Sequence, residues 1–551
     1  MIIRNFIEKL ENSKLSFWGG VFLLFTMMFF RTFLENFTNS SNLYHLSGII
    51  DTFFHYPFWF LILFLSIFII ARILTKEKIE KIAKVVTFFS FALLIPPIID
   101  LIISKGQIPY SFIVGNSSQL FKLFFTYLGS NAIGIGIRIE IIITLIGLGF
   151  YIFYKTKEIK RAIVGIIVLY SVIFIMGVFP AFVFGVQNAI TKQYQTMEKS
   201  TVVDFYFHKE PLNAVTANRT FVLDAVTDKD FYPLPQQKII NQYSLTLSII
   251  FLLINVVLLG WCLFLYSSRK FFAVLKNFRY LRIIHYFLML SVGIYLGINI
   301  LGKNPIGSLF DLLSFLSLFL ALLFAWLFTV WENDEVDIEI DKISNQSRPL
   351  AQIESIVSPE EWQNLKFIFL VLALLFAFLC GLYTFIFILL SLFVAHIYSA
   401  PPLRLKRFLG ISSLLYAIPN LLVVWMGFFM TAGTENLSAF PTKYSLGILG
   451  IIFLVENGKN IKDIEGDKKE GIKTLPVVFG EKMGKLLTGF CLFLGALLVP
   501  FIFYFNLYTF LTAIIFGIIF FLLTIKKNYK EKYLVFSEII YIITFFVLMN
   551  L

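Results

Sequence analysis

Long apolar stretches alternate with short polar ones along most of the 551-residue chain. A helix needs about 20 apolar residues to cross the hydrocarbon core of a bilayer. Fifteen stretches approach this length, at 15–34, 54–73, 85–104, 137–155, 162–187, 243–266, 283–301, 307–330, 361–380, 382–398, 411–431, 442–457, 484–505, 507–526 and 534–551. The pattern therefore predicts an all-α polytopic membrane protein.

A basic stretch at 267–282 interrupts this series, with six predicted spans before it and nine after it. We therefore expect an N-terminal transmembrane domain at 1–268, followed by a nine-helix bundle at 280–551. Residues 188–242 are polar but contain few basic residues for their length, which is typical of an extracytoplasmic loop. Segment 118–130 is apolar, but a span there would invert every later loop, so we expect it to be interfacial or re-entrant.

Composition agrees with a membrane protein, because 58% of the residues are apolar and only 15% are charged. A water-soluble globule needs a far more charged surface. The formal net charge is +12, but Lys and Arg fall in short loops such as 76–84 and 154–161. Basic loops of this kind mark the cytoplasmic side of a membrane protein. We therefore expect an integral protein of the cell membrane, with no nucleic-acid partner and with its polar active loops on the cytoplasmic side.

Cysteine and histidine give little indication of metal chemistry. Cys262, Cys380 and Cys491 each lie within an apolar span, where a thiol serves packing rather than a disulfide framework. The five histidines show no ligand-like spacing, which argues against an imidazole-held zinc ion. Any metal should therefore be a hard cation held by oxygen.

Two polar segments that follow apolar spans repeat one spacing of oxygen-bearing side chains. The first carboxylate segment is Asp334, Asp337 and Asp341, and the second is Asn460, Asp463 and Asp467. Steps of three and then four residues would place each set on one face of a helix. Carboxylates this close repel one another in the reduced dielectric near a membrane, so a cation must neutralise them. One such run alone is usually a solvated face, but the repeat predicts a two-sided divalent-cation site.

Mg²⁺ prefers a few carboxylates, retained waters and substrate phosphate oxygens to a cage made wholly of protein. Two small carboxylate faces therefore predict Mg²⁺ and a phosphorylated substrate held between them. Most basic residues near the two segments only enforce topology. Arg348 and Lys406 are the stronger candidates for anion binding, because each lies in a loop close to a span. Cations at these positions would stabilise a departing diphosphate.

The residues around both carboxylate segments resemble the motifs of the UbiA-type intramembrane prenyltransferases. NDEVDIEID, at 333–341, resembles that family's first aspartate motif, and SRPL, at 347–350, is similar to its continuation. KNIKDIEGDKKEGIKTLPVVFG, at 459–480, resembles the second aspartate motif. YSAPPLRLKR, at 398–407, is similar to the tyrosine-and-lysine loop between the family's fourth and fifth helices. The resemblance covers about residues 280–551.

This resemblance implies a nine-helix bundle around a cavity that is capped on the cytoplasmic side. Mg²⁺ ions would bridge the aspartate motifs to an isoprenyl diphosphate. The allylic C–O bond would ionise, and a hydrophobic or phosphorylated acceptor within the membrane would capture the carbocation. The implied role is a Mg²⁺-dependent prenyl transfer in lipid or quinone biosynthesis.

The resemblance also assigns roles residue by residue. The implied catalytic residues are Asn333, Asp334, Asp337, Asp341, Asp463 and Asp467. All of these except Asn333 would be metal ligands. The implied diphosphate-binding residues are Arg348, Tyr398, Lys406, Lys459 and Asn460. The second motif departs from the family pattern, because Val455 stands in place of an arginine and Asn460 in place of an aspartate. Asn460 offers a carbonyl oxygen but no charge, so we expect weaker Mg²⁺ affinity.

Two other interpretations stay open at this point. The chain could be a transporter or lipid-handling membrane protein whose carboxylates bind a coupling cation, since acids at such positions often mark ion pathways. The N-terminal half could be a scaffold or partner-binding module, and its segment 68–104 faintly resembles Yip1-type membrane domains. Asp100, Arg138 and Glu140 are the charges nearest its apolar interior. Arg138 and Glu140 are two residues apart, so they should not pair along one helix.

Overall fold

A computed structural model of the chain describes residues 2–38, 50–104, 120–129, 133–191, 234–301, 306, 309–344, 348, 356–432 and 436–549. Every regular element within these residues is a helix. In this described part, thirteen helices are long and apolar enough to cross a membrane, at Phe53–Thr75, Ile79–Ile103, Ile135–Thr156, Ile159–Gly177, Ser244–Tyr266, Tyr280–Ile300, Leu309–Val336, Pro359–Cys380, Leu382–Ser399, Ile411–Thr431, Glu481–Ile502, Leu507–Ile525 and Glu531–Met549. The predicted all-α membrane fold is confirmed.

The remaining predicted spans are shorter than expected. The stretch at 15–34 contains an apolar helical segment of only Trp18–Leu34, and the stretch at 442–457 forms the 14-residue helix α21 (Thr442–Val455). The stretch at 162–187 is divided near Val178, where α9 ends and α10 begins. Segment 118–130 contains a short apolar helix at Leu120–Gly129. Most of the loop predicted at 188–242 lies outside the described residues, and its last part, from Leu234, is helical.

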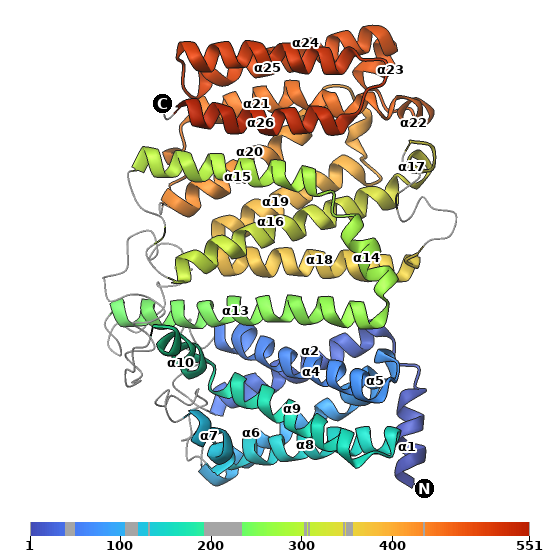
Figure 1. Cartoon of the computed structure of the whole chain (residues 1–551), viewed down its shortest axis with the longest axis vertical. Helices are drawn as coiled ribbons and strands as arrows, with labels where there is room; N and C mark the ends of the chain where they lie inside the picture. The colour runs from blue at the N-terminus through green and yellow to red at the C-terminus, as the bar shows by residue number, and fades with distance from the viewer. Residues whose placement is uncertain are drawn as a thin grey trace. The chain divides into compact units, whose positions relative to one another are not determined.

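The helices, which are labelled in Figure 1, divide into two compact units. The first unit contains the described residues up to 271 together with 309–313. Its helices are α1 (Ile2–Glu11), α2 (Phe17–Thr38), η1 (Asp51–His55), α4 (Tyr56–Thr75), α5 (Ile79–Phe89), η2 (Ser90–Leu94), α6 (Ile95–Ser104), α7 (Leu120–Thr126), η4 (Tyr127–Gly129), α8 (Ile135–Thr156), α9 (Ile159–Gly177), α10 (Phe179–Thr191) and α13 (Leu234–Tyr266).

The second unit contains the other described residues, from 272 onward. Its helices are α15 (Tyr280–Leu301), most of α16 (Leu309–Val336), α17 (Ile338–Ser344), α18 (Pro359–Cys380), α19 (Leu382–Ser399), η6 (Leu405–Arg407), α20 (Ile411–Ala432), η7 (Leu437–Ala439), α21, η8 (Glu456–Ile461), α22 (Ile464–Lys469), α23 (Leu475–Phe479), α24 (Glu481–Ile502), α25 (Leu507–Ile525) and α26 (Glu531–Met549). Helix α14 (Ser268–Lys276) joins the two residue ranges.

Charged side chains inside the first unit are paired across helices. Arg31 of α2 forms an ion pair of 3.0 Å with Glu140 of α8, and only 1% of the Arg31 side chain is exposed. Glu140 therefore has an ion-pair partner on another helix. Glu11 of α1 is also buried and accepts hydrogen bonds from Tyr151 and Lys155 of α8. Burying a charge without a partner is expensive, so these pairs fix how the helices pack.

Two helices of the second unit, α15 and α20, approach each other closely through glycines. A Cβ atom on Gly293 would lie 2.0 Å from the carbonyl oxygen of Val424, and one on Gly427 would lie 2.3 Å from that of Leu290. No side chain fits at such distances, so the backbones touch directly. Small residues allow this type of contact between membrane helices. The contact matters for function because α15 and α20 both line the cavity described below.

Replacing Gly293 by alanine is expected to destabilise the protein by about 1–3 kcal/mol, because the added methyl group forces the two helices apart. The measurement is thermal unfolding of the detergent-solubilised chain. The matched control is Gly450→Ala in α21, where a Cβ meets no atom within 4 Å. Alanine stabilises a helix more than glycine does, so the control should melt at the wild-type temperature or above it. Equal melting of the two variants would contradict the close contact.

Candidate functional site

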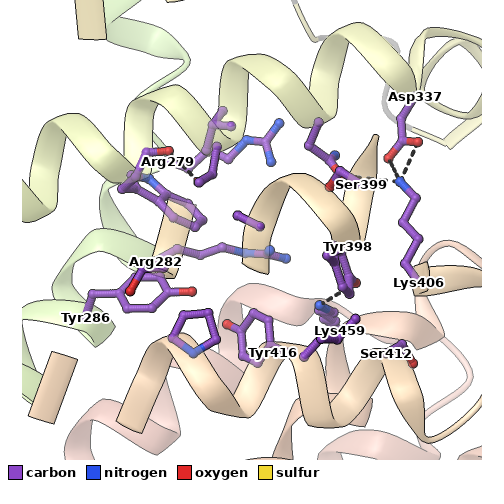
Figure 2. A pocket seen from close by; sticks show the side chains of 18 of the residues that line it. Arg279, Arg282, Tyr286, Asp337, Tyr398, Ser399, Lys406, Ser412, Tyr416 and Lys459 are labelled. Atoms are coloured by element: carbon purple, nitrogen blue, oxygen red, sulfur yellow. Dashed lines mark hydrogen bonds and ion pairs between the residues drawn. The ribbon is translucent and has the colours of Figure 1, made fainter. Parts of the chain in front are cut away.

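One cavity of about 210 Å³ in the second unit collects ten of the eleven side chains predicted from the sequence. These are Asn333, Asp337, Asp341, Arg348, Tyr398, Lys406, Lys459, Asn460, Asp463 and Asp467. Figure 2 shows part of the wall, in which Lys406 points to Asp337 and Lys459 lies beside Tyr398. The eleventh residue, Asp334, is not a wall residue. Side chains from segments 126 residues apart in sequence, Asp337 and Asp463, thus line one space.

The first carboxylate segment is helical but not one unbroken helix. Asn333 and Asp334 lie on α16, Asp337 lies at the junction, and Asp341 lies on α17. Backbone hydrogen bonds from Asp337 to Asn333, 2.9 Å, and from Asp341 to Asp337, 2.8 Å, keep the helical spacing across the junction. The helix therefore continues beyond residue 330, where the predicted span ends. Trp331 is fully buried and stacks on Trp362 of α18, which holds this polar end of α16 in a helical conformation.

Asp334 is turned away from the cavity and is 1% exposed. Its carboxylate accepts hydrogen bonds from Asn277 at 3.0 Å and from Arg348 at 3.2 Å, and it forms an ion pair with Arg279. Charge-assisted bonds of this kind are strong and directional. Asp334 therefore anchors the residues before α15 and the loop after α17 to the end of α16.

Asp337 and Asp341 are wall residues, and each is paired with a basic side chain. Lys406, which is buried, donates to both oxygens of Asp337, and Arg404 lies 3.2 Å from the same carboxylate. Arg348 forms an ion pair with Asp341. Burial raises the pKa of the Asp341 carboxyl to about 6, although Arg348 opposes this shift. Burial likewise lowers the pKa of the Lys406 ammonium, and Asp337 opposes that shift.

The second carboxylate segment begins in the 3₁₀ helix η8 and continues into α22. Asn460 lies on η8, Asp463 directly precedes α22, and Asp467 lies on α22. Asp467 is 8% exposed, yet its carboxylate forms no hydrogen bond or ion pair with any residue in the described ranges. Burial, and then the charge of Asp463, raise the pKa of the Asp467 carboxyl to about 7. Within the described residues, no basic side chain therefore neutralises the Asp467 carboxylate by direct pairing.

The donor chemistry of the wall fits a hard divalent cation such as Mg²⁺. Carboxylate oxygens of Asp337, Asp341, Asp463 and Asp467 face the same space, together with the Asn460 amide. Within the described residues, no three acidic, histidine or cysteine side chains are already gathered closely enough to hold a metal ion. Asp467, which has no direct partner among the described residues, is the natural first ligand, and Asp463 lies four residues before it. Asp337 and Asp341 could join them only by exchanging their contacts with Lys406 and Arg348.

Lys459 occupies an aromatic corner of the cavity. Its ammonium donates to the Tyr398 hydroxyl at 3.1 Å, lies 4.1 Å from the centre of the Tyr416 ring, and forms an ion pair with Glu456. Burial is the largest single influence and disfavours the charge, but Glu456 and Tyr398 together outweigh it and raise the pKa of the Lys459 ammonium. A cation over an aromatic face is stabilised by about 0.5–2 kcal/mol. Lys459 therefore remains a fixed positive charge on the cavity wall.

Sequence reasoning missed several wall residues, namely Arg279, Arg282, Tyr286 and Tyr416. The two arginines lie in a basic stretch before a span, where positive charge was interpreted only as a topology signal. Arg282 is held by an ion pair with Glu531 of α26, which directs it into the bundle. The two tyrosines lie within apolar spans, and no local pattern distinguishes them from packing residues.

The polar and apolar parts of the cavity are segregated. Leu322, Ala325, Ile388, Leu392 and Val423 form an apolar wall from α16, α19 and α20. The charged residues come from the ends of these helices and from the connecting loops. The cavity can therefore hold a molecule with an anionic head and an apolar tail.

Comparison with known proteins agrees with this geometry. The family described as the UbiA prenyltransferase family matches residues 306–534. This part of the chain, which we call the UbiA region, belongs to the UbiA prenyltransferase family. The UbiA region includes both carboxylate segments and the loop that carries Lys406, whereas Arg279 and Arg282 precede it.

Characterised relatives of the UbiA region are named as prenyltransferases. Digeranylgeranylglyceryl phosphate synthase from Methanosphaera stadtmanae is 29% identical over 33% of this chain and 64% of its own length. The enzyme of that name from Thermococcus gammatolerans is 31% identical over 29% of this chain and 54% of its own length. Homogentisate phytyltransferase from Synechocystis sp. is 29% identical over 35% of this chain and 64% of its own length. The chain thus spans between about half and two-thirds of the length of these relatives.

A solved structure is also similar to this chain. A UbiA homolog from Archaeoglobus fulgidus, bound to GPP and Mg²⁺, is 19% identical, with a TM-score of 0.40. The similarity covers 51% of this chain and 100% of that one.

Proposed function

We propose that the UbiA region catalyses Mg²⁺-dependent transfer of an isoprenyl group from an isoprenyl diphosphate to a lipid-soluble or phosphorylated acceptor. The observation that carries this proposal is the cavity that combines residues of two acidic segments, six basic side chains and an apolar wall. The names of the relatives support the reaction class, and they include both a glyceryl phosphate product and an aromatic acceptor. Both acceptor classes are therefore candidates.

In the proposed reaction, the bond between the allylic carbon and the diphosphate oxygen breaks, and both electrons leave with the diphosphate. A nucleophilic atom of the acceptor then donates an electron pair to the carbon and loses a proton. Mg²⁺, held by Asp337, Asp341, Asp463 and Asp467, would neutralise the developing charge on the diphosphate. Arg348 and Lys406 would add fixed donors to the same anion, since preorganised charges of this kind stabilise transition states strongly.

The apolar wall has a separate role in this proposal. It would bury the isoprenyl tail and keep water from the allylic carbocation, which water would otherwise quench. The rings of Tyr398 and Tyr416 already make cation–π contacts with the Lys459 ammonium, so they are not available to stabilise the carbocation in the same way. The tyrosines would therefore serve mainly to place Lys459 toward the diphosphate.

The proposal also includes the membrane orientation and the domain boundaries of the chain. We place both carboxylate segments on the cytoplasmic side of the cell membrane, because the basic loops share that side. We propose that residues 1–268 form a membrane domain distinct from the bundle at 280–551. An accessibility assay with single cysteines at Lys468 and Lys157, labelled in intact cells by an impermeant reagent, would test the orientation. Both positions should remain unlabelled until the membrane is permeabilised.

The reaction is tested with purified full-length protein, radiolabelled geranylgeranyl diphosphate and two acceptors, geranylgeranylglyceryl phosphate and homogentisate. The proposal predicts a prenylated product from at least one acceptor, formed with Mg²⁺ and abolished by EDTA. A control incubation without acceptor separates transfer from hydrolysis. Folded protein that releases no diphosphate with either acceptor, and with no longer isoprenyl diphosphate, would contradict the proposal.

Asn460→Asp is expected to lower the Mg²⁺ concentration needed for half-maximal activity by about three- to tenfold, because cation affinity rises with the number of charged ligands. The measurement is a Mg²⁺ titration of diphosphate release. The matched control is Asn506→Asp, which introduces the same charge at the N-cap of α25, outside the cavity. Aspartate caps a helix as well as asparagine does, so the control should leave the titration unchanged. An unchanged or higher Mg²⁺ requirement in Asn460→Asp would rule out a ligand role for this position.

A further inference from the structure

The second unit contains another cavity, of about 110 Å³, whose wall shares no residue with the first. It is lined by α15, α20, α21, α24, α25 and α26. Helices α15 and α20 line both cavities, with Tyr286 and Val423 in the first and Met289 and Val424 in the second. The second cavity therefore lies on another side of the α15–α20 pair. Almost all of its wall is apolar, with contributions from Ile452, Val499 and Phe545, among others.

One carboxyl group interrupts this apolar wall. Helix α26 contributes Glu538, Tyr541, Ile542, Phe545, Phe546 and Met549. Steps of three and four residues place these side chains on one helix face. Glu538 lies seven residues after Glu531, the first residue of α26, or about 10 Å along the helix at 1.5 Å per residue. It therefore lies well inside the span, where an ionisable side chain is costly and is usually functional.

Glu538 has no hydrogen-bond or ion-pair partner among the described residues. The charged groups nearest to it are Arg282 and Glu531. These two are already paired with each other, and Glu531 also binds Lys462 at 2.6 Å. The hydroxyl of Tyr541, the neighbouring polar group, donates to the carbonyl oxygen of Ala496 at 2.8 Å. The Glu538 carboxyl group therefore keeps its hydrogen-bonding capacity for a ligand.

A second polar wall residue, His285, has a defined hydrogen-bond role. The Asn420 side-chain nitrogen donates to the Tyr416 carbonyl oxygen at 2.9 Å, so its side-chain oxygen is the acceptor for His285. His285 Nε2 lies 3.1 Å from that oxygen and therefore carries the proton. In a neutral ring the other nitrogen, Nδ1, is then an acceptor. Glu538 and His285 can therefore both accept a hydrogen bond.

We propose that this second cavity binds a neutral lipid-type alcohol, whose apolar body fills the cavity and whose hydroxyl group hydrogen-bonds to Glu538. A hydroxyl group both donates and accepts, so it complements a carboxyl group in either protonation state. A carboxylate ligand would place a second acidic group beside Glu538 in an apolar wall, where a charge without a partner is costly. An ammonium ligand would meet repulsion from Arg282, which already acts on Glu538. An alkane would fill the cavity but leave the half-buried carboxyl group without a hydrogen bond.

The inference does not rest on the proposed prenyl transfer, because its residues and its ligand are separate from the first cavity. The test uses the full chain in nanodiscs and a photoreactive dodecan-1-ol that carries a diazirine on its chain. The crosslinked peptides are mapped by mass spectrometry. A photoreactive dodecane, dodecanoic acid and dodecylamine of the same design are the comparison probes.

The expected result is labelling of α26 or α24 by the alcohol about tenfold above that by the alkane, because the alkane leaves the carboxyl group without a hydrogen bond. Excess unlabelled dodecan-1-ol should compete. Glu538→Leu should abolish the preference for the alcohol, and Val499→Phe, which fills the cavity from α24, should reduce labelling by every probe. The matched control is Glu481→Gln, an exposed acid at the start of α24 that lies outside the wall, and it should label as wild type does.

Three results would overturn the inference. Equal labelling by alcohol and alkane would show that the cavity accepts any apolar chain. Stronger labelling by dodecylamine would assign the site to a cation. Retained alcohol preference in a Glu538→Leu protein of normal melting temperature would show that the carboxyl group does not recognise the ligand. Catalytic activity enters none of these measurements, so the failure of either proposal is recognised separately.

Discussion

Asp467→Asn is expected to lower kcat/KM for prenyl transfer by about 10³-fold, with little effect on folding, because it removes a metal-binding carboxylate. Among the described residues, Asp467 is a wall acid with no direct hydrogen-bond or ion-pair partner. Its neighbour Asp463 repels it, so neutralisation should not destabilise the folded chain. The measurement is diphosphate release under subsaturating substrate, together with a thermal melt of each protein.

The matched control for this variant is Glu465→Gln. Glu465 is an exposed acid on the same short helix, α22, and it is not a wall residue. The control should retain nearly full activity. Comparable losses in the two variants would mean that charge near α22, rather than a specific ligand, determines activity.

Substitutions in the two carboxylate segments distinguish a prenyltransferase from a cation-coupled transporter. If Asp337→Ala and Asp467→Ala both leave prenyl transfer intact but abolish an ion-dependent flux, the carboxylates serve transport. The enzyme account predicts the reverse, namely loss of transfer in both variants. Asp337→Ala also leaves Lys406 without its carboxylate, so its melting temperature must be compared with that of the wild type.

Lys406→Met is expected to lower kcat/KM by about 10²–10³-fold, the typical loss when one preorganised donor to a developing anion is removed. Lys406 is 6% exposed and points into the cavity beside Asp337 (Figure 2). When a diphosphate and Mg²⁺ bind, Asp337 would contact Mg²⁺ and Lys406 would contact the diphosphate. The measurement is again diphosphate release, with KM determined separately from kcat.

Two further variants define what the loss in Lys406→Met means. Lys468→Met removes an exposed lysine of α22 outside the wall and should be nearly neutral. Lys406→Arg keeps the charge and should recover part of the activity. If Lys406→Met unfolds at a normal temperature and still turns over at the wild-type rate, Lys406 has no role in diphosphate binding.

Helices were predictable from the sequence wherever an apolar run was long, because the cost of unpaired backbone groups in lipid leaves few alternatives. Helix starts with strong local signals were also predictable. Ser358, Pro359 and Glu361 have the spacing of an N-cap, and α18 begins at Pro359 with a complete capping box. The end of α16 was not predictable, since the polar residues after Trp331 stay helical where Trp331 stacks on Trp362, a contact between distant parts of the sequence.

The candidate site was predictable in its chemistry but not in its contacts. The repeated acidic spacing and the nearby basic loops indicated which residue types would meet, and ten of eleven line one cavity. The orientation of Asp334 could not be inferred, because it depends on Asn277 and Arg279, which precede α15. Arg282 was missed for a similar reason, since its partner Glu531 lies 249 residues away. Long-range pairing is set by the packing of helices, which no local pattern records.

The most direct test of the central claim is diphosphate release by the purified full-length protein from geranylgeranyl diphosphate and an acceptor, measured with Mg²⁺ and after chelation with EDTA. The account predicts acceptor-dependent release with Mg²⁺, no release after chelation, and recovery when Mg²⁺ is restored. Folded protein that releases no diphosphate under any of these conditions, or that releases it equally with and without Mg²⁺, would contradict the account.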